Sequence, residues 1–412
     1  MIKQWVLLLA VLCWAGLGAG AALAARELDH GLVALAEKHY DKALKQLQPL
    51  ADQGDPVAQF HLAWMYEHGQ GVKKDLRAAF VWYQKAALQG NADAMNNLGA
   101  LYHTGEGTKQ SFKLAAHWYQ KAAELGQPQA FFNMAMMISE GQGFRQSAKV
   151  AAQWLDRAAR TDNLEAQYRL GLMYEQGDGV AQNFETAAQW YEAAATRGHA
   201  RASANLGALY QMGRGLTRSY AEAAKWYAIG ADKGDPMAQN NLGALYQQGR
   251  GVEKDQAQAV EWFRKSAEQH FLGGEYNLGL VYYQGRGVEK DPREAFKWFE
   301  RAANQGDPVA QNNVAIQYQK GVGVTKNLKK AAEWYRKAAE QNYGLAQINL
   351  GTMYRRGLGV PRDLEKSAYW YRKAEANGMP QAKQALEMLN QPMPPEEETP
   401  QGEDTPVEES AP

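Results

Sequence analysis

The sequence contains eight histidines, the residues most often used for metal binding and for acid–base catalysis near neutral pH. They are scattered along the chain at His30, His39, His61, His68, His103, His117, His199 and His270. None falls in an H-E-x-x-H spacing, which places two zinc ligands on one face of a helix. His61 and His68 lie two turns apart on one helix face, so metal binding by this pair is one interpretation. Solvated or helix-capping roles fit better, and we predict no metal site.

Glycine pairs of the form G-x-G are the second feature that can indicate chemistry, because glycine-rich loops often bind phosphate. Here each pair follows a helical pattern rather than a strand, and the pair recurs nine times, so turn geometry explains it. Carboxylates are abundant, but no pair stands apart from the recurring pattern, whereas catalysis needs a unique constellation. Cys13 is the only cysteine. We therefore expect no catalytic residue, no cofactor and no enzymatic activity.

An internal repeat of 36 residues organises the chain, because two residue types recur at that interval without insertion. The glycine pairs are Gly69/Gly71, Gly105/Gly107, Gly141/Gly143, Gly177/Gly179, Gly213/Gly215, Gly249/Gly251, Gly285/Gly287, Gly321/Gly323 and Gly357/Gly359. The tryptophans are Trp82, Trp118, Trp154, Trp190, Trp226, Trp262, Trp298, Trp334 and Trp370. This regularity predicts an array of identical structural units.

Each unit predicts two helices separated by the glycine pair. In residues 235–270, Asp235 and Pro236 form a helix start, since Asp caps the helix and Pro is tolerated at its first position. Ala238, Leu242 and Tyr246 then share one face. Next to them comes a small residue in every unit, which implies a close approach of two helices, because glycine inside a helix is costly. These small residues are Ala63, Gly99, Ala135, Gly171, Gly207, Gly243, Gly279, Ala315 and Gly351.

The second helix of each unit begins four residues after the second glycine, at a residue type that caps helices well. These residues are Asp75, Ser111, Ser147, Asn183, Ser219, Asp255, Asp291, Asn327 and Asp363. A later glycine ends most of the second helices in a left-handed conformation. These glycines are Gly54, Gly90, Gly126, Gly198, Gly234, Gly306 and Gly378. One unit alone buries too little surface to fold, so neighbouring units must stack.

The two ends of the chain differ from the array. Lys3, the apolar stretch from Trp5 to Ala15 and small residues at Ala22 and Ala24 predict a signal peptide at residues 1–24, cleaved before Ala25. An uncleaved membrane anchor is the alternative. Residues 391–412 hold seven acidic residues and no Lys or Arg, which predicts a disordered, Pro-rich acidic tail. The formal net charge is zero, which gives no reason to expect nucleic acid as a partner.

The pattern A-x-x-N-L-G-x-x-Y-x-x-G-x-G-V-x-x-D-x-x-x-A-x-x-W-Y/F-x-x-A-A-x-x-G resembles the Sel1-like repeat, a relative of the tetratricopeptide repeat. The resemblance covers residues 55–378 and implies an all-α, right-handed superhelical solenoid of nine repeats. Residues 25–54 would then form a divergent N-terminal helix pair, and residues 379–390 a capping helix. The unit 127–162 departs most, with Ile138 and Leu155 in place of Tyr and Phe144 in place of Val.

The resemblance also implies that a partner binds in a concave groove lined by the first helices. An asparagine column there, including Asn205, Asn241, Asn277 and Asn313, suggests an amide ladder that grips an extended peptide backbone. Equally, each asparagine can tie its helix to the neighbouring repeat. We leave the two interpretations open at this point.

Specificity would come from the groove positions that vary. Six of them make the N-terminal half strongly apolar, which is typical of protein interfaces, although such stripes also pack between repeats. They are Phe60, Trp64, Phe132, Met136, Tyr168 and Leu172. Tyr276 holds the same position in its repeat as Phe60, Phe132 and Tyr168. Arg355 and Arg356 lie on the groove rim, within a stretch from Lys320 to Lys373 that has twelve basic and four acidic residues. The acidic tail either folds back over this basic end or simply solvates the chain.

We therefore predict a periplasmic or secreted scaffold that binds a protein or peptide of the cell envelope and has no integral membrane span after signal cleavage. As a family, Sel1-like proteins with signal peptides imply roles in envelope assembly, exopolysaccharide export, signalling control or host contact. The alternative class is an envelope glycan-binding protein or hydrolase, because aromatic groove residues can stack on sugars.

Overall fold

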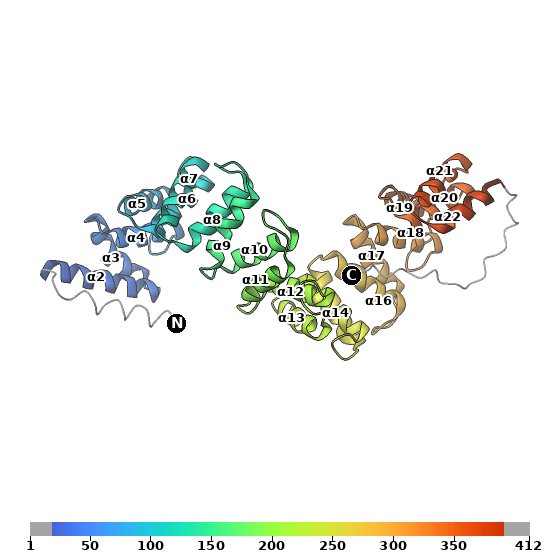
Figure 1. Ribbon diagram of the computed structural model, residues 1–412, viewed down its shortest axis with the longest axis horizontal. Helices are drawn as coiled ribbons and strands as arrows, with labels where there is room; N and C mark the ends of the chain where they lie inside the picture. Colours follow the sequence, from blue (N-terminus) through green and yellow to red (C-terminus); the bar gives the residue numbers. More distant parts are fainter. Residues whose placement is uncertain (1–18, 391–412) are drawn as a thin grey trace. The chain divides into compact units, whose positions relative to one another are not determined.

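The computed structural model describes residues 19–390, and every regular element within that range is helical (Figure 1). The chain forms two compact units, Met1–Trp190 and Tyr191–Pro412, whose boundary falls inside α11 (Phe184–Ala195). Most of the predicted signal peptide and all of the predicted acidic tail lie outside the described residues. Helix α2 begins at Ala19, so the cleavage that we expect before Ala25 would shorten this helix.

Unit 1 is a series of antiparallel helix pairs in which each helix from α2 to α9 packs against its successor. The helices before α11 are α2 (Ala19–Ala36), α3 (Tyr40–Asp52), α4 (Pro56–His68), α5 (Leu76–Leu88), α6 (Ala92–Thr104), α7 (Phe112–Glu124), α8 (Pro128–Glu140), α9 (Ala148–Ala159) and α10 (Leu164–Gln176). The pair α2/α3 precedes the first repeat, and its Leu47 and Leu50 share a core with Leu62 and Met65 of α4.

Unit 2 continues the same order and ends in a single helix that packs on the last repeat. Its helices after α11 are α12 (Ala200–Met212), α13 (Tyr220–Asp232), α14 (Pro236–Gln248), α15 (Gln256–Glu268), α16 (Leu272–Gln284), α17 (Pro292–Asn304), α18 (Pro308–Lys320), α19 (Leu328–Glu340), α20 (Gly344–Arg356), α21 (Leu364–Ala376), α22 (Pro380–Glu387) and the 3-10 helix η1 (Met388–Asn390). The predicted all-α solenoid of helix pairs is confirmed.

Local capping sets where the helices begin. All nine residues predicted to cap the second helices accept a hydrogen bond from a backbone N–H of the first turn. In α15, for example, Asp255 Oδ1 accepts from the N–H of Gln258 at 2.9 Å. Asp235 caps the first helix α14 in the same way, at 2.8 Å from the N–H of Ala238. Each such cap stabilises a helix by about 1 kcal/mol.

The second helices end as predicted, with φ angles in the left-handed region. The predicted glycines all have positive φ, and Gly234 is representative at 90°. In the three repeats that lack this glycine, Asp162, His270 and Asn342 take the position with φ of 64°, 59° and 67°. Asn, Asp and His tolerate this region better than other residues with a Cβ atom, so the chain turns at the same place in every repeat.

Within a repeat, the small residue of the first helix lies under an aromatic ring of the second helix. A Cβ atom at Gly243 would lie 2.9 Å from two ring carbons of Phe263, and one at Gly99 would lie 2.8 Å from the ring of Tyr119. These distances are shorter than van der Waals contact. The predicted close approach of the two helices is therefore confirmed, and the ring it accommodates is buried.

Buried glutamines join one repeat to the next. Gln239 of α14 donates from Nε2 to the carbonyl oxygen of Ala231 in α13 at 3.2 Å. Its Oε1 accepts from Gln269 Nε2 at 2.8 Å. We call these two hydrogen bonds of one glutamine a glutamine bracket, and it recurs around Gln59, Gln311 and Gln347. Because a buried amide without partners is costly, the glutamine bracket fixes how neighbouring repeats pack.

In α16, Glu275 stands where these repeats have glutamine. Its carboxylate is fully buried, and it accepts from Arg301 Nε at 2.9 Å and from Gln305 Nε2 at 2.7 Å. Arg301 Nη2 also donates to the carbonyl of Ala267 at 3.4 Å, the position that the glutamine takes in other repeats. Arginine thus supplies both the counter-charge and the missing donor, which a buried carboxylate requires.

The unit 127–162, which departs most from the repeat pattern, still forms both helices, α8 and α9. Ile138 and Leu155, which replace tyrosines, are both buried with 4% of their surface exposed. Apolar side chains therefore take over the packing role of the rings, as the hydrophobic effect allows.

At Gln317, both polar atoms of a buried side-chain amide lack a partner. Gln317 of α18 is 2% exposed, and the two atoms are its Nε2 and its Oε1. The equivalent residues of the other repeats are apolar, for example Leu245, Val281 and Met353. Burying an amide without partners costs roughly 1–3 kcal/mol. Gln317 therefore lowers the stability of its repeat.

Replacing Gln317 with Leu should raise the free energy of unfolding by about 1–2 kcal/mol, because the orphaned amide is removed and the volume is kept. Urea denaturation followed by circular dichroism measures this. Gln239→Leu is the matched control and should destabilise, since both ends of that amide are hydrogen-bonded. A loss of stability in Gln317→Leu would contradict this interpretation.

Candidate partner-binding surface

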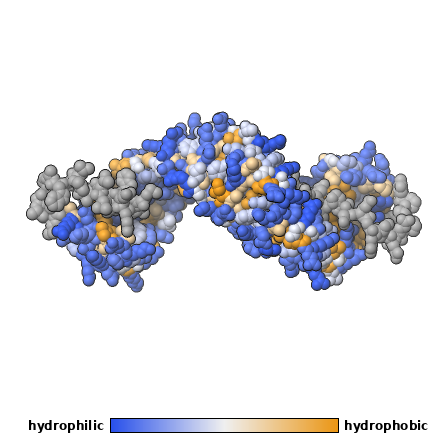
Figure 2. Space-filling view, turned by 90° about the horizontal axis from the view of Figure 1, so that it is seen from below, coloured by the Kyte–Doolittle hydropathy of each residue, from blue (hydrophilic) through white to orange (hydrophobic). Residues whose placement is uncertain are grey.

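The first helices of successive repeats position the predicted groove residues. Within unit 2, α12 contacts α14 and α14 contacts α16, so these first helices lie side by side. Within unit 1, a hydrogen bond from Asn133 to Asn96 joins α8 to α6. Each predicted groove column therefore runs across neighbouring helices of a unit. Figure 2 shows apolar residues in separate patches on a mainly hydrophilic surface.

Five of the predicted apolar residues are half-buried in unit 1: Phe60, Trp64, Phe132, Met136 and Leu172. The Trp64 ring stacks on His68 with centroids 4.5 Å apart, and the Phe60 ring lies 5.8 Å from that of Tyr83. The Arg169 guanidinium lies 5.9 Å from the Phe132 ring. Part of each side chain packs against the protein and part faces outward, as a binding surface requires.

Three other predicted groove residues are buried, so the expectation that they face a partner is wrong. Tyr168 is 9% exposed, Tyr276 2% and Asn313 5%. The Tyr276 ring packs 5.6 Å from that of Phe299, and Asn313 Nδ2 donates to the Tyr276 hydroxyl at 3.3 Å. Their surface is used in packing between helices and repeats, so they offer almost none to a ligand.

The asparagine column forms a chain of hydrogen bonds between repeats in unit 1. Asn133 Nδ2 donates to Asn96 Oδ1 at 2.9 Å, and Asn96 Nδ2 donates to Asn97 Oδ1 at 3.2 Å. Asn97 Nδ2 then donates to the Tyr83 hydroxyl at 3.0 Å. The Tyr83 hydroxyl in turn donates to Glu67 Oε2 at 2.5 Å. The amides therefore tie each first helix to the helices around it.

Unit 2 repeats this arrangement. Asn277 Nδ2 donates to Asn240 Oδ1 at 2.9 Å, and Asn240 Nδ2 donates to Asn241 Oδ1 at 3.1 Å. Asn349 Nδ2 donates to Asn312 Oδ1 at 3.1 Å. Asn205, Asn241 and Asn277 are half-buried. The acceptors Asn96, Asn240 and Asn312 belong to a second column, whose structural role was not predicted although its asparagines are visible in the sequence.

Three tyrosines of the second helices and one histidine of a first helix have pKa values shifted toward their neutral forms. Burial raises the pKa of the Tyr83 hydroxyl above its ordinary value, and its hydrogen bond to Glu67 raises it further. Burial also raises the pKa of Tyr227 and of Tyr335. Burial lowers the pKa of His61, while the nearby Asp93 carboxylate acts in the opposite direction. Protonated tyrosines serve as hydrogen-bond donors, so these shifts serve the packing between helices.

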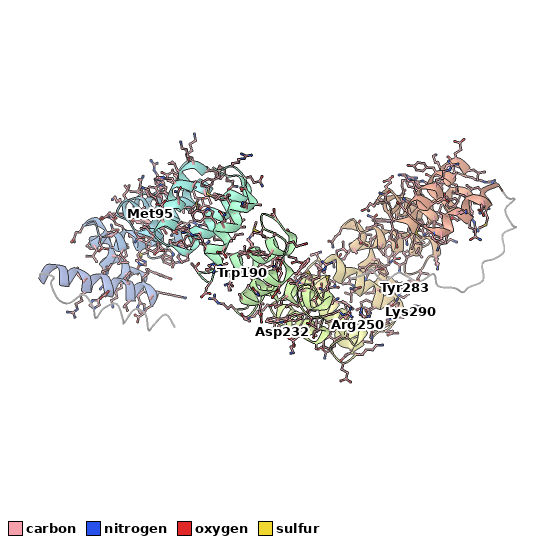
Figure 3. All side chains as sticks on the ribbon, in the orientation of Figure 1. Met95, Trp190, Asp232, Arg250, Tyr283 and Lys290 are labelled. Carbon is pink, nitrogen blue, oxygen red and sulfur yellow. The ribbon has the colours of Figure 1, made fainter. Side chains whose placement is uncertain are left out.

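The rim position near the end of each first helix varies from repeat to repeat. Arg355 donates from Nη2 to the carbonyl of Met388 at 2.7 Å and so holds η1 against α20, while Arg356 is exposed. In α16 the same position carries Tyr283, and the Lys290 ammonium lies 5.9 Å from its ring centroid (Figure 3). Of the two predicted rim arginines, only Arg356 is exposed.

Within residues 19–390, no group of three His, Cys, Asp or Glu side chains is arranged to hold a metal ion. In the same range, no helix combines the length and the apolar character needed to span a bilayer. What the first helices present is a set of half-buried apolar and amide side chains on a rigid frame. Such an arrangement has the composition of a surface that can bind another molecule by shape complementarity.

Stacked helix pairs with this repeat geometry define the class of all-α helical-repeat proteins. The profile of the Sel1 repeat matches nine segments, and the chain belongs to that family. The segments are residues 56–91, 92–127, 128–163, 164–199, 200–235, 236–271, 273–307, 308–343 and 344–379. The resemblance inferred from the sequence is confirmed.

Two solved structures support this assignment. One is a protective antigen present in uropathogenic Escherichia coli strains that displays an SLR fold, with 32% identity and a TM-score of 0.83. The match covers 90% of this chain and 80% of that chain. The other is a Sel1 repeat protein from Oxalobacter formigenes, with 33% identity, a TM-score of 0.62 and coverage of 76% and 91%. No curated protein matched the chain.

The structural role of the asparagine column is open to test. Asn133→Ala and Asn277→Ala should each lower the free energy of unfolding by about 1–2 kcal/mol, because each leaves the amide oxygen of the neighbouring repeat without its donor. Urea titration of the single variants gives this value. Exposed Gln153→Ala is the control. Unchanged stability in both asparagine variants would show that these amides do not hold the repeats together.

Proposed function

We propose that this protein is a non-enzymatic scaffold of the periplasm or the extracellular space that binds a protein or peptide on the face formed by its first helices. The observation that carries this proposal is the half-buried apolar group Phe60, Trp64, Phe132, Met136 and Leu172 in unit 1. Aromatic and methionine side chains anchored in this way are typical centres of protein interfaces. Membership of the Sel1 repeat family supports a role in protein interaction.

The location rests on the N-terminal sequence. A basic residue, an apolar stretch and small residues before Ala25 form the pattern of a cleaved secretory signal. A similar protein is a protective antigen of uropathogenic E. coli strains, which agrees with exposure outside the cytoplasm. On this basis we place the partner in the cell envelope, where a scaffold would serve assembly, export, signalling or host contact.

A peptide fits the unit 1 face better than a sugar does. Glycan binding uses open aromatic faces for stacking, but Trp64 stacks on His68 and the Arg169 guanidinium lies near the Phe132 ring. The parts of these rings that remain outward suit side chains of an interacting protein. Arg169 also forms an ion pair with Glu165 at 2.6 Å, so the positive charge beside Phe132 is already paired.

Photo-crosslinking in the native envelope tests the proposal. A crosslinking amino acid at Met136 should capture a discrete protein, identified by mass spectrometry, whereas one at the exposed Ile229 of α13 should not. Trp64→Ala combined with Phe132→Ala should lower the capture at least tenfold, because the apolar anchors are lost. Tyr369→Ala combined with Ile229→Ala, at exposed positions of unit 2, should leave capture unchanged.

Circular dichroism of both double variants distinguishes loss of binding from loss of folding. Identical adducts from Met136 and Ile229, or full capture by the folded Trp64/Phe132 variant, would exclude this face as the binding surface.

A further inference from the structure

The second helices of unit 1 expose an unusual set of aliphatic side chains. Of the ten large hydrophobic residues exposed within the described part of the chain, five lie on or next to α5, α7 and α9. They are Val81, Leu88, Leu114, Leu125 and Val150. Leu88 is 71% exposed and Leu125 58%. None of them belongs to the first-helix face discussed above, so the proposed partner-binding surface does not account for them.

The same three helices are basic. They carry six cations and two acidic residues, and α5 carries no acidic residue at all. The cations are Arg77, Lys85, Lys113, Lys121, Lys149 and Arg157. Of the two acids, Glu124 accepts from Gln120 at 3.0 Å and Asp156 pairs with Arg160 at 2.8 Å. The basic residues therefore dominate the charge of this face, which we call the basic–aliphatic face.

The repeat places these side chains in parallel rows. Arg77, Lys113 and Lys149 hold the same position at the start of successive second helices. Loop contacts keep those starts in register, because a Cβ at Gly107 would meet the Leu76 carbonyl oxygen at 2.1 Å. A second row of cations, Lys85, Lys121 and Arg157, lies over tryptophan rings of the same helices. The distances from the charged group to the ring centroid are 3.8 Å for Lys85 and Trp82, 5.2 Å for Lys121 and Trp118, and 5.0 Å for Arg157 and Trp154.

Two second helices of unit 2, α13 and α17, carry paired charges at the corresponding positions. Glu222 and Glu294 occupy the positions of Leu114 and Val150, and each pairs with a lysine three residues later: Lys225 at 2.5 Å and Lys297 at 2.7 Å. In unit 1 both partners of this pair are absent from the corresponding positions, since Leu114 is followed by His117 and Val150 by Gln153. The ion-paired glutamates at these two positions of unit 2 thus correspond to aliphatic residues in unit 1.

The residue types indicate the chemistry of the ligand. Four of the six cations are lysines, and the apolar residues are Val and Leu. Lysine is depleted in protein–protein interfaces, and Leu and Val are uncommon among their binding hot spots. Aliphatic residues surrounded by Lys and Arg are instead typical of surfaces that rest on anionic lipid headgroups, where each cation adds attraction and the aliphatic groups enter the interface.

We propose that the basic–aliphatic face of unit 1 docks on an anionic phospholipid surface. Peripheral contact of this kind needs no membrane span. It would hold the protein at a bilayer while the first-helix face stays available to its partner. The proposal is independent of the partner's identity, because it uses other side chains on other helices.

Vesicle co-sedimentation tests the proposal with the purified protein, expressed with its own N-terminal segment. Vesicles of equimolar phosphatidylglycerol and phosphatidylcholine should bind the protein, and binding should weaken as salt is raised. Vesicles of phosphatidylcholine alone should bind it far less. The combined variant Arg77→Glu, Lys113→Glu and Lys149→Glu should bind mixed vesicles on the order of 100-fold more weakly, since each lost cation costs roughly fivefold.

Three controls make the result specific. Arg293→Glu, Lys329→Glu and Lys330→Glu make the same change of charge on second helices of unit 2 and should bind like the unaltered protein. Leu88→Ser combined with Leu125→Ser should weaken binding without a change of charge. Trp64→Ala combined with Phe132→Ala should leave vesicle binding intact, which separates this proposal from the proposed function.

Failure of the unaltered protein to bind mixed vesicles would overturn the proposal. Equal weakening by the two triple variants would also overturn it, because net charge rather than this face would then decide. A crosslinking amino acid at Leu88 tests the alternative occupant. If the protein does not bind vesicles, and Leu88 captures an acidic protein that the unit 1 triple variant fails to capture, the face binds a protein instead.

Discussion

The approach of each loop to the preceding repeat is the contact on which the rest of the structure depends. The second glycine of a G-x-G pair lies against the backbone at the start of the preceding second helix. A Cβ at Gly251 would lie 2.1 Å from the Tyr220 carbonyl oxygen, and one at Gly323 would lie 2.0 Å from that of Pro292. No side chain fits there. Since every loop must reach the same place on its neighbour, insertions are excluded and the period stays at 36 residues.

Because the loops keep this register, equivalent side chains of successive 36-residue repeats align in columns. The glutamine brackets and asparagine chains then form because equivalent residues of successive repeats come to the same distance from one another. Variation within a column changes the local surface without altering the frame. Unit 1 uses this freedom for apolar residues at Phe132 and Met136, whereas unit 2 has asparagine and alanine at Asn240 and Ala244.

Features fixed by a residue and its chain neighbours could be predicted from the sequence. The caps, the left-handed helix ends and the small residue under an aromatic ring all belong to this group, because each depends on chemistry within one repeat. The burial of Tyr168, Tyr276 and Asn313 could not be predicted, since it depends on what the adjacent repeat places beside them. Asn313, for example, is buried in contact with Tyr276 of the preceding repeat, while Asn277 donates to an asparagine and stays half-buried.

The same distinction applies to function. The family resemblance indicated which face of a tetratricopeptide-like array binds ligands, but the residues that remain accessible there emerged only from the packing. The basic–aliphatic face of unit 1 could not be predicted from the sequence, because single lysines and leucines are common on helix surfaces. Their significance lies in comparison with Glu222 and Lys225 at matched positions, where the charges are paired.

The contact between neighbouring repeats can be measured by comparing substitutions at two glycines of unit 2, Gly251 and Gly234. Gly251 and Gly234 both have positive φ, at 71° and 90°, so alanine strains the backbone at either position. Only Gly251 touches the neighbouring repeat, because nothing lies within 4 Å of a Cβ at Gly234. By urea denaturation, Gly234→Ala should cost about 1 kcal/mol and Gly251→Ala about 3 kcal/mol or more. Equal losses would show that backbone conformation alone, and not contact between repeats, accounts for the conserved spacing of this glycine along the chain.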